Sequence, residues 1–369
     1  MKRIVILLTA LTIIQFGNSS LFGQVKGITD MLTGLSDSKN KDAVEDLFQA
    51  YLKPYANAFG ANLNGGWYNT AKPHKLGGFD LTLSVSASFV PSSDKTYNPS
   101  QVLAGSNFVV NPSTGTAPTV AGDNKSGPEV SYTAGGKTLA KFKTTRGTGV
   151  GVIPSPMLQL GIGLIKHTDI TVRYLPSFNI SDFGSMNMWG VGVKHSLKQW
   201  IPGIKMAPFF NLSVFGGYTK LTTSLNMGLA PEYYATNLGA TVVNDGAKYD
   251  NQKMQLVASG FTGNVIASFD LPVITFYGGA GFSSTKTNLK LNGNYPMVGV
   301  DAASNTLVVK KEFMKVDPID IEMKSMDGSK TKPRLNAGFR LKFAVVTLHF
   351  DYTYANYSVA TAGLGISFR

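Results

Sequence analysis

The sequence of 369 residues contains no cysteine and only four histidines. The absence of cysteine excludes disulfides, thiolate metal sites and lipid-modified cysteines. The histidines, His74, His167, His195 and His349, lack the spacing of metal ligands. The sequence therefore predicts no metal site and no cofactor. Beyond Gly23 there is also no apolar run of the roughly 20 residues that a transmembrane helix needs.

The first 23 residues have the features of a secretory signal peptide. Lys2 and Arg3 precede an apolar run at 4–14, and small and polar residues follow up to Gly23. This order of positive charge, apolar core and small residues directs export. The formal net charge of +12 is typical of nucleic-acid binding, but an exported chain rarely meets nucleic acid. A solvated basic surface, or contact with anionic lipid headgroups, is the expected consequence.

Hydrophobic residues make up 43% of the chain, and glycine is frequent, with 40 residues. Because long apolar runs are missing, the apolar residues must lie in short segments. Short alternating strands rich in glycine and aromatic residues have this composition. The strand at 79–89 is an example, since Phe79, Leu81 and Leu83 alternate with polar residues and the strand is long enough to cross a membrane.

The end of the chain alternates strictly between apolar and small or polar residues. Only an extended strand sorts such a pattern onto two faces. The segment also resembles the C-terminal signal that the barrel-assembly machinery reads on outer-membrane β-barrels. The residues at the four signal positions are Thr361, Gly363, Ile366 and Phe368.

The alternating segments predict an all-β, antiparallel transmembrane barrel of about ten strands. The polar intervals 91–146, 222–251 and 285–332 could each hold a further hairpin, so 12 or 14 strands remain open. A periplasmic N-terminus and a periplasmic end of the last strand require an even number. The expected domains are the signal peptide at 1–23, a helical plug or cap at 24–77 and the barrel at 78–369.

The hairpin formed by the strands at 334–343 and 346–354 fixes the orientation of their side chains. A two-residue turn pairs Phe343 with Val346 and places apolar residues on the outer face, so that Arg340 faces His349 on the inner face. The same alternation predicts a set of charged and polar side chains in the lumen. They are Asp80, Asp169, Arg173, Arg334, Arg340, Lys342, His349 and Asp351.

An amphipathic helix is expected before the barrel. It begins at Asp42, and Gly60 is expected to end it. Its acidic first turn would meet Arg340 and Lys342 if the helix caps the periplasmic mouth, which is the arrangement expected for ten strands. With 12 or more strands the helix could enter the lumen as a plug. Its apolar stripe consists of Phe48, Tyr51, Leu52, Tyr55 and Phe59.

The mature chain resembles a family of outer-membrane barrels from Bacteroidota-type bacteria that has no assigned activity. The resemblance rests on the helical segment Tyr51-Leu52-Lys53-Pro54-Tyr55 and on the connector at 198–203, Lys-Gln-Trp-Ile-Pro-Gly. A looser resemblance, in architecture alone, is to the long-chain fatty-acid outer-membrane transporters, whose Asn-Pro-Ala signature is absent. Both resemblances imply a bacterial outer-membrane barrel, in contact with outer-membrane lipids and lipopolysaccharide.

Three functions fit such a barrel. The first is a passive channel or uptake barrel that selects small solutes by lumen width and charge. The second is a non-transporting barrel that serves as a surface anchor or interaction protein. The third, an outer-membrane lipid hydrolase, has the weakest support, because His195 and Ser196 are adjacent and point to opposite faces of a strand. No catalytic residue is therefore predicted, and the chain is not expected to be an enzyme.

Overall fold

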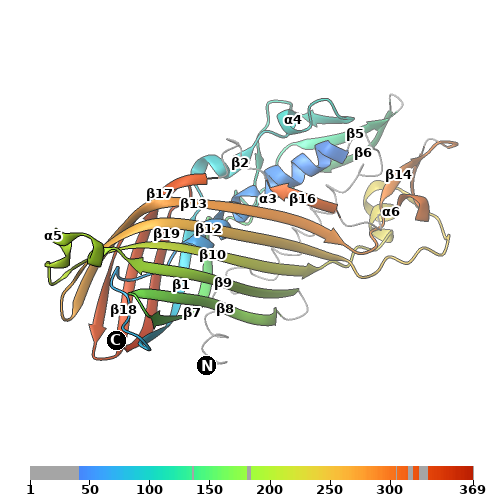
Figure 1. The fold of residues 1–369 in the computed structure, drawn as a ribbon. Helices are drawn as coiled ribbons and strands as arrows, with labels where there is room; N and C mark the ends of the chain where they lie inside the picture. The colour runs from blue at the N-terminus through green and yellow to red at the C-terminus, as the bar shows by residue number, and fades with distance from the viewer. Residues whose placement is uncertain are drawn as a thin grey trace.

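Ten long antiparallel strands form a closed barrel (Figure 1). The computed structural model describes residues 41–134, 137–180, 184–304, 306–314, 319–323 and 331–368, so the expected signal peptide lies outside the described residues. The predicted fold class and the count of ten strands are confirmed. The strands are β1 (Phe79–Phe89), β7 (Val152–Leu164), β8 (Thr168–Ile180), β9 (Gly184–Ser196), β10 (Phe210–Asn226), β12 (Lys253–Asp270), β13 (Ile274–Asn292), β17 (Thr331–Phe343), β18 (Val346–Tyr354) and β19 (Val359–Phe368).

Each of these strands pairs with its neighbours along the chain, and β19 pairs with β1 to close the ring. The hairpin β17–β18 has the register predicted from its alternation. Phe343 lies opposite Val346 and Arg340 lies opposite His349. Ala344 adopts a φ of 54° in the connecting turn. A shift by one residue would exchange the two faces of both strands, which explains why the sequence specifies this register so well.

The outer face of the barrel is apolar, with aromatic residues near both rims. Phe79 and Phe368 stack at the end with short turns, with their ring centroids 5.1 Å apart. Trp189 and Tyr218 stack nearer the other end, at 5.6 Å. A tilted strand of about ten residues spans the lipid-facing band of outer-membrane barrels, which is roughly 25 Å high.

The two ends of the barrel differ in the length of their connections. Short connections at 165–167, 271–273 and 344–345 lie at one end, together with the connector at 197–209. That connector contains η3 (Lys198–Trp200) and α5 (Pro202–Lys205). Long connections at 90–151, 227–252 and 293–330 lie at the other end. Short turns face the periplasm in barrels of this type, and long loops face outward.

The described parts of the three long connections fold into a cap beyond the barrel (Figure 1). Three small sheets organise it, made of β2 with β4, of β3 with β5 and β6, and of β11 with β15 and β14. In addition, β16 pairs with the extended end of β13. The elements are η1 (Ser92–Asp94), β2 (Thr96–Tyr97), α4 (Pro99–Val102), β3 (Phe108–Asn111), β4 (Ala117–Pro118), β5 (Glu129–Ala134), β6 (Lys137–Lys143), α6 (Glu232–Leu238), β11 (Thr241–Val242), β14 (Val298–Asp301), β15 (Thr306–Val309), η4 (Lys311–Phe313) and β16 (Ile319–Met323).

The cap has a hydrophobic core of its own. Val44, Phe48 and Tyr51 are buried there among apolar residues of all three long connections. The Tyr51 hydroxyl donates a hydrogen bond to the carbonyl of Arg146 at 2.9 Å. Burial raises the pKa of Tyr97 in the same core, so its hydroxyl is neutral. Such a core, outside the barrel, gives the long connections a defined structure.

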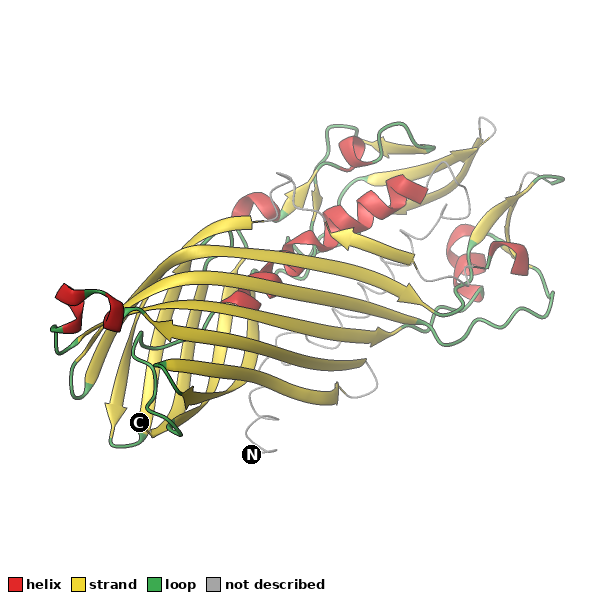
Figure 2. Cartoon of the chain, in the orientation of Figure 1, coloured by secondary structure: helices red, strands yellow, loops and turns green. Residues whose placement is uncertain are grey.

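The helix before the barrel, α3 (Lys41–Asn64), joins the cap to the lumen (Figure 2). It continues past Gly60, so the predicted end at that residue is wrong. A Cβ at position 60 would lie 2.0 Å from Cγ2 of Thr285, so the glycine permits close contact with β13 instead of ending the helix. No helix among the described residues, α3 included, combines the length and the apolar character of a membrane span.

The direction of α3 also differs from the expectation. Its first turn, with Asp42, lies at the cap, and its last turn enters the barrel, where Leu63 packs against side chains of β7, β8, β9, β10 and β12. A helix rises about 1.5 Å per residue, so Asp42 is about 30 Å from Leu63. The predicted contact of the acidic first turn with Arg340 and Lys342 is therefore wrong. A barrel of ten strands still has room for the last turn of α3, because Gly60 has no side chain and lets the helix lie close to β13.

The lipid-facing band predicts a depth-dependent cost of charge on β1. Leu83→Arg, near the middle of the strand, should lower the free energy of unfolding in lipid vesicles by about 2–4 kcal/mol. Phe89→Arg, at the rim of the same strand, should cost about 0–1 kcal/mol. Urea titrations of both variants measure the difference, and equal costs at the two positions would contradict a membrane band.

The cap core predicts that the cap can unfold without the barrel. Phe48→Ala should destabilise the cap by about 3–5 kcal/mol, because it removes a fully buried aromatic ring. Limited proteolysis should then cleave the long connections faster, while the barrel keeps its heat-modifiable electrophoretic mobility. Asp46→Ala, on the exposed face of the same helix, is the control and should leave proteolysis unchanged.

Candidate functional site

The chain between α3 and β1 passes through the lumen from the cap end to the short-turn end. We call residues 65–78 the lumen segment. Its residues are hydrogen-bonded to inward-facing side chains of several strands around the barrel. Gln159 Nε2 of β7 donates to the carbonyl of Trp67 at 3.1 Å, and Ser213 of β10 donates to the carbonyl of Ala71. The amide of Ala71 donates to Oγ of Ser268 on β12 at 3.0 Å.

Arg173 of β8 binds the end of α3 from one side of the wall. Its Nη1 donates to the carbonyl of Leu63 at 2.9 Å and its Nη2 donates to the carbonyl of Gly65 at 2.6 Å. Its Nε donates to Gln159 at 3.0 Å, and the guanidinium lies 3.6 Å from the ring centroid of Trp67. The side chain is completely buried.

Arg334 of β17 binds the same helix end from another part of the wall. Its Nη1 donates to the carbonyl of Asn64, and to Thr262 Oγ1 at 3.1 Å. Its Nη2 donates to Thr353 Oγ1 at 3.1 Å. The Thr353 hydroxyl in turn donates to the carboxylate of Asp351 at 3.2 Å. Arg334 is therefore linked to an acidic group through one hydroxyl.

The two arginines are held by the negative end of the helix. The carbonyls of the last turn have no partner within α3, and they carry the negative end of the helix dipole. Cations at that position are stabilised, and hydrogen bonds to a charged group are each worth about 1.5–3 kcal/mol. None of the described residues forms an ion pair with Arg173, so the helix end is its principal acceptor.

Aromatic rings fill the lumen next to this helix end. Trp67 and Tyr68 of the lumen segment pack against Phe215 with ring centroids 5.4 and 5.5 Å away. Tyr277 completes the cluster. The Tyr68 hydroxyl donates to Asn336 at 2.7 Å. The middle of the lumen is therefore occupied by packed aromatic rings, of which Tyr68 is hydrogen-bonded to the wall.

The carboxylate of Asp270 accepts hydrogen bonds from several donors nearer the short-turn end than the aromatic cluster. Thr70 of the lumen segment donates to its carboxylate at 2.7 Å. Asn211, Ser268 and Thr275 donate to the same carboxylate from the wall at 2.8, 2.6 and 3.0 Å. Arg340 lies 3.7 Å from that carboxylate and donates to the side chain of Asn69 at 3.2 Å. The lumen segment is thus part of the network that neutralises these charges.

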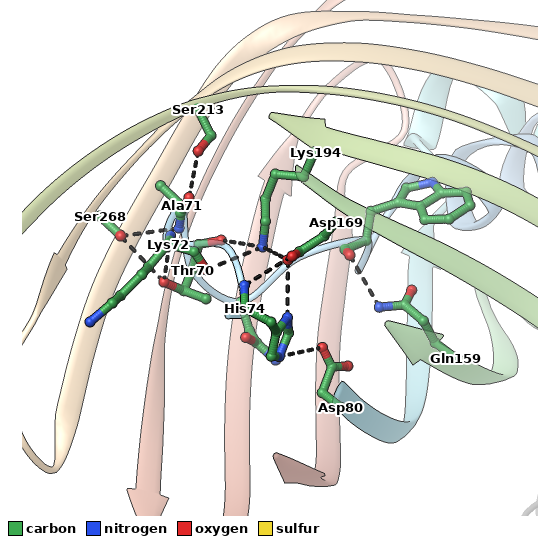
Figure 3. A network of polar contacts seen from close by, with 12 residues as sticks. Thr70, Ala71, Lys72, His74, Asp80, Gln159, Asp169, Lys194, Ser213 and Ser268 are labelled. Carbon is green, nitrogen blue, oxygen red and sulfur yellow. Dashed lines mark hydrogen bonds and ion pairs between the residues drawn. The ribbon is translucent and has the colours of Figure 1, made fainter. Parts of the chain in front are cut away.

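His74 joins the last part of the lumen segment to β1, β8 and β9 (Figure 3). Its Nδ1 lies 3.0 Å from the carboxylate of Asp169, and its Nε2 lies 3.3 Å from that of Asp80. Its amide donates to Asp169 at 2.9 Å. Lys194 Nζ contacts the same carboxylate at 3.0 Å. Lys194 also donates to the carbonyls of Thr70 and Lys72 at 3.4 Å.

The His74 cluster binds the lumen segment to the wall. Nδ1 of the imidazole lies within hydrogen-bond distance of Asp169, whereas Nε2 lies 3.3 Å from Asp80 and has no hydrogen-bond partner among the described residues. No serine or threonine hydroxyl hydrogen-bonds to this imidazole in the described structure. The described residues also contain no group of side chains that could hold a metal ion. The cluster therefore fixes the lumen segment in place.

The structure places most of the predicted lumen residues inside the barrel but distributes them over three clusters. Asp169 and Asp80 meet at His74, Arg173 and Arg334 meet at the helix end, and Arg340 reaches Asp270. His349 is buried beside Gly363 and has no hydrogen-bond partner among the described residues. Lys342 is half-buried at the short-turn end of β17. The predicted stripe of α3 lies in the cap and at the barrel mouth.

Several functional residues were absent from the sequence prediction. Gln159 and Lys194 alternate with predicted outward residues, so their inward direction could have been deduced from the strand period. Asp270 is the last residue of β12, and its role depends on donors from other strands and from the lumen segment. His74 and the backbone carbonyls at the end of α3 give no signal in the sequence, because their partners depend on the path of the lumen segment.

A polar cleft of about 80 Å³ opens between the end of α3 and the wall. Asn57 and Asn64 of α3 line it on one side, and Lys332 and Arg334 of β17 on another. Oδ1 of Asn64 and Nε of Arg334 are buried there without a hydrogen-bond partner among the described residues. Among the described residues that line the cleft, Lys332 and Arg334 are cationic and none is a carboxylate.

The contacts of Arg173 predict a large effect of its removal. Arg173→Met should lower the free energy of unfolding by about 3 kcal/mol. It leaves the carbonyl of Gly65 buried without its donor, and the carbonyl of Leu63 with only a long hydrogen bond of 3.4 Å from Thr219. Lys72→Met removes an exposed cation from the lumen segment and should have almost no effect. Urea titration followed by tryptophan fluorescence measures both, and an equal effect of the two substitutions would contradict the role of the helix end.

Known structures with similar arrangements are outer-membrane barrels. The outer membrane protease OmpT from Escherichia coli is 8% identical, with 79% of this chain and 97% of that chain covered and a TM-score of 0.31. The toluene transporter TbuX from Ralstonia pickettii is also 8% identical, with 85% and 99% covered and a TM-score of 0.24. The transport unit of the autotransporter AIDA-I from Escherichia coli is 9% identical, with 87% and 99% covered and a TM-score of 0.25.

Similarities this distant carry no function from one chain to another. No curated protein matches the sequence. The sequence does match a family of unknown function, DUF6588, over residues 1–368. Because this match extends over nearly the whole sequence, the chain belongs to that family.

Proposed function

We propose that this protein is a closed outer-membrane barrel that anchors a folded cap at the cell surface. The observation that carries this proposal is the lumen segment, which is hydrogen-bonded to inner faces of the wall from Arg173 down to Asp169. A barrel of about eight strands has room only for side chains, and open channels need many more strands. Ten strands with a chain segment between them leave no continuous path for a solute.

The cap supports the anchoring role. Its core contains aromatic and aliphatic residues from α3 and from all three long connections. The long connections bury this common core beyond the mouth of the barrel. The chemistry of the lumen fits an anchor, because Asp169 and Lys194 bind the lumen segment through the amide of His74 and the carbonyls of Thr70 and Lys72.

The proposal includes the route by which the protein reaches the membrane. Residues 1–23 direct export as a signal peptide, and the strand that ends in Phe368 is read by the barrel-assembly machinery. Outer-membrane lipids and lipopolysaccharide then surround the apolar band. An origin of the family in Bacteroidota-type bacteria stays a prediction.

A second candidate function is uptake of a small anionic solute. The cleft beside Lys332 and Arg334 favours it, because the cleft lies at the mouth and contains buried polar atoms without partners. Uptake would require the lumen segment to leave its place, which breaks the contacts of Arg173 and of the His74 cluster. Transport would therefore be gated and slow, in contrast to the predicted passive channel.

Conductance in planar bilayers distinguishes the closed barrel from a channel. The unaltered protein should show no steady conductance, because the lumen segment fills its lumen. A variant that lacks residues 41–78 should conduct, since its strands and the C-terminal strand pairing remain. Steady conductance of the unaltered protein would contradict the proposal, and current that small anions block would favour uptake.

A further inference from the structure

The lumen segment joins the short-turn end of the barrel to a helix that leaves the barrel at its other end. Phe79 begins β1 at the short-turn end, where it lies opposite Phe368. Gly65 follows α3 inside the lumen, where Arg173 Nη2 binds its carbonyl. Between these two residues the chain remains inside the closed ring of strands. The helix that precedes the lumen segment is consequently on the same side as the long connections (Figures 1 and 2).

We infer that the barrel exports its own N-terminal helix α3 to the cell surface. This inference rests on the proposed orientation, in which the short turns face the periplasm. A chain that enters the outer membrane from the periplasm must move α3 across the membrane to reach this position. The lumen segment marks the path, because it is the part of the chain that remains in the lumen afterwards.

The helix cannot make this crossing in its folded form through the finished barrel. A helix with its side chains is about 10–12 Å wide. The lumen of the finished barrel is filled by the aromatic cluster around Trp67 and by the polar contacts of Asp270 and His74. The crossing therefore occurs with the segment extended, or before β1 and β19 pair to close the ring. Gly65 and Gly66 follow the helix and keep this part of the chain narrow, with Gly66 at a φ of 64°.

The contacts outside the barrel make the crossing directional. Val44, Leu47, Phe48 and Tyr51 are each at most 2% exposed, and their partners belong to the cap. The part of the lumen near the short turns contains Asp169, Asp270 and Lys194, and it is too polar to replace the apolar surroundings of these side chains. The helix is therefore retained outside once the cap folds on it, and the bonds from Arg173 and Arg334 hold its last turn.

Single cysteines test this inference, because the chain has no cysteine of its own. Four variants are compared in Gram-negative cells with a membrane-impermeant maleimide. Asp42→Cys reports on the start of α3, and Asn124→Cys on the cap. Lys75→Cys reports on the end of the lumen segment, and Met206→Cys on the connector at the short-turn end. All four side chains are exposed.

We expect Asp42→Cys and Asn124→Cys to be labelled in intact cells. Lys75→Cys and Met206→Cys should be labelled only after the outer membrane is opened. Labelling of Asn124→Cys without labelling of Asp42→Cys in intact cells would overturn the export of α3 and leave the proposed orientation standing. Labelling of Met206→Cys without Asn124→Cys would overturn the orientation and the export together.

A second position protects the test against a local defect at residue 42. Asp46→Cys lies one turn further along α3 and is also exposed. Its labelling in intact cells should equal that of Asp42→Cys, and heat-modifiable mobility shows that each variant forms the barrel. Protection of both positions in intact cells, with a folded barrel, would overturn the export of α3.

Discussion

The binding of two wall arginines to the end of one helix is the interaction on which the rest of this structure depends. Arg173 and Arg334 come from strands that are far apart in the sequence, and both are buried. They bind the carbonyls of Leu63, Asn64 and Gly65. A buried guanidinium without acceptors would be very costly, and so would a buried helix end without donors. Each therefore requires the other, and together they connect wall, helix and lumen segment.

The position of the helix end determines what the lumen can do. With α3 in place, the lumen segment runs from the helix end toward the short turns. Along this path Tyr68, Thr70 and His74 each hydrogen-bond it to the wall. Two wall carboxylates, Asp270 and Asp169, thereby accept hydrogen bonds from the lumen segment. The same position sends the helix outward, where its apolar stripe forms part of the cap core. The packing of the lumen and the packing of the cap thus both depend on the position of α3.

Much of the barrel could be predicted because a strand in a membrane wall obeys one local rule. Alternation with a period of two decides which side chains face lipid, and a one-residue shift would exchange the faces. The pairs of β17 and β18, and the inward direction of Arg173 and Arg334, followed from this rule. The prediction failed for α3, since Gly60 was taken as a helix end. Its actual role depends on Thr285, which lies more than 200 residues away in the chain.

The sequence by itself therefore determined the class of fold, an even number of about ten strands with 12 or 14 left open, and the two faces of the wall. These features depend on residues that are neighbours in the chain or in one hairpin. Only the tertiary structure decided the direction of α3, the path of the lumen segment and the partners of the buried charges. The reason is that a lumen contact joins a side chain from any strand to a backbone carbonyl, which has no residue type and leaves no pattern in the sequence. The local sequence patterns would be the same with α3 at either end of the barrel. Only the tertiary structure shows that α3 lies at the end with the long connections and not at the short-turn end.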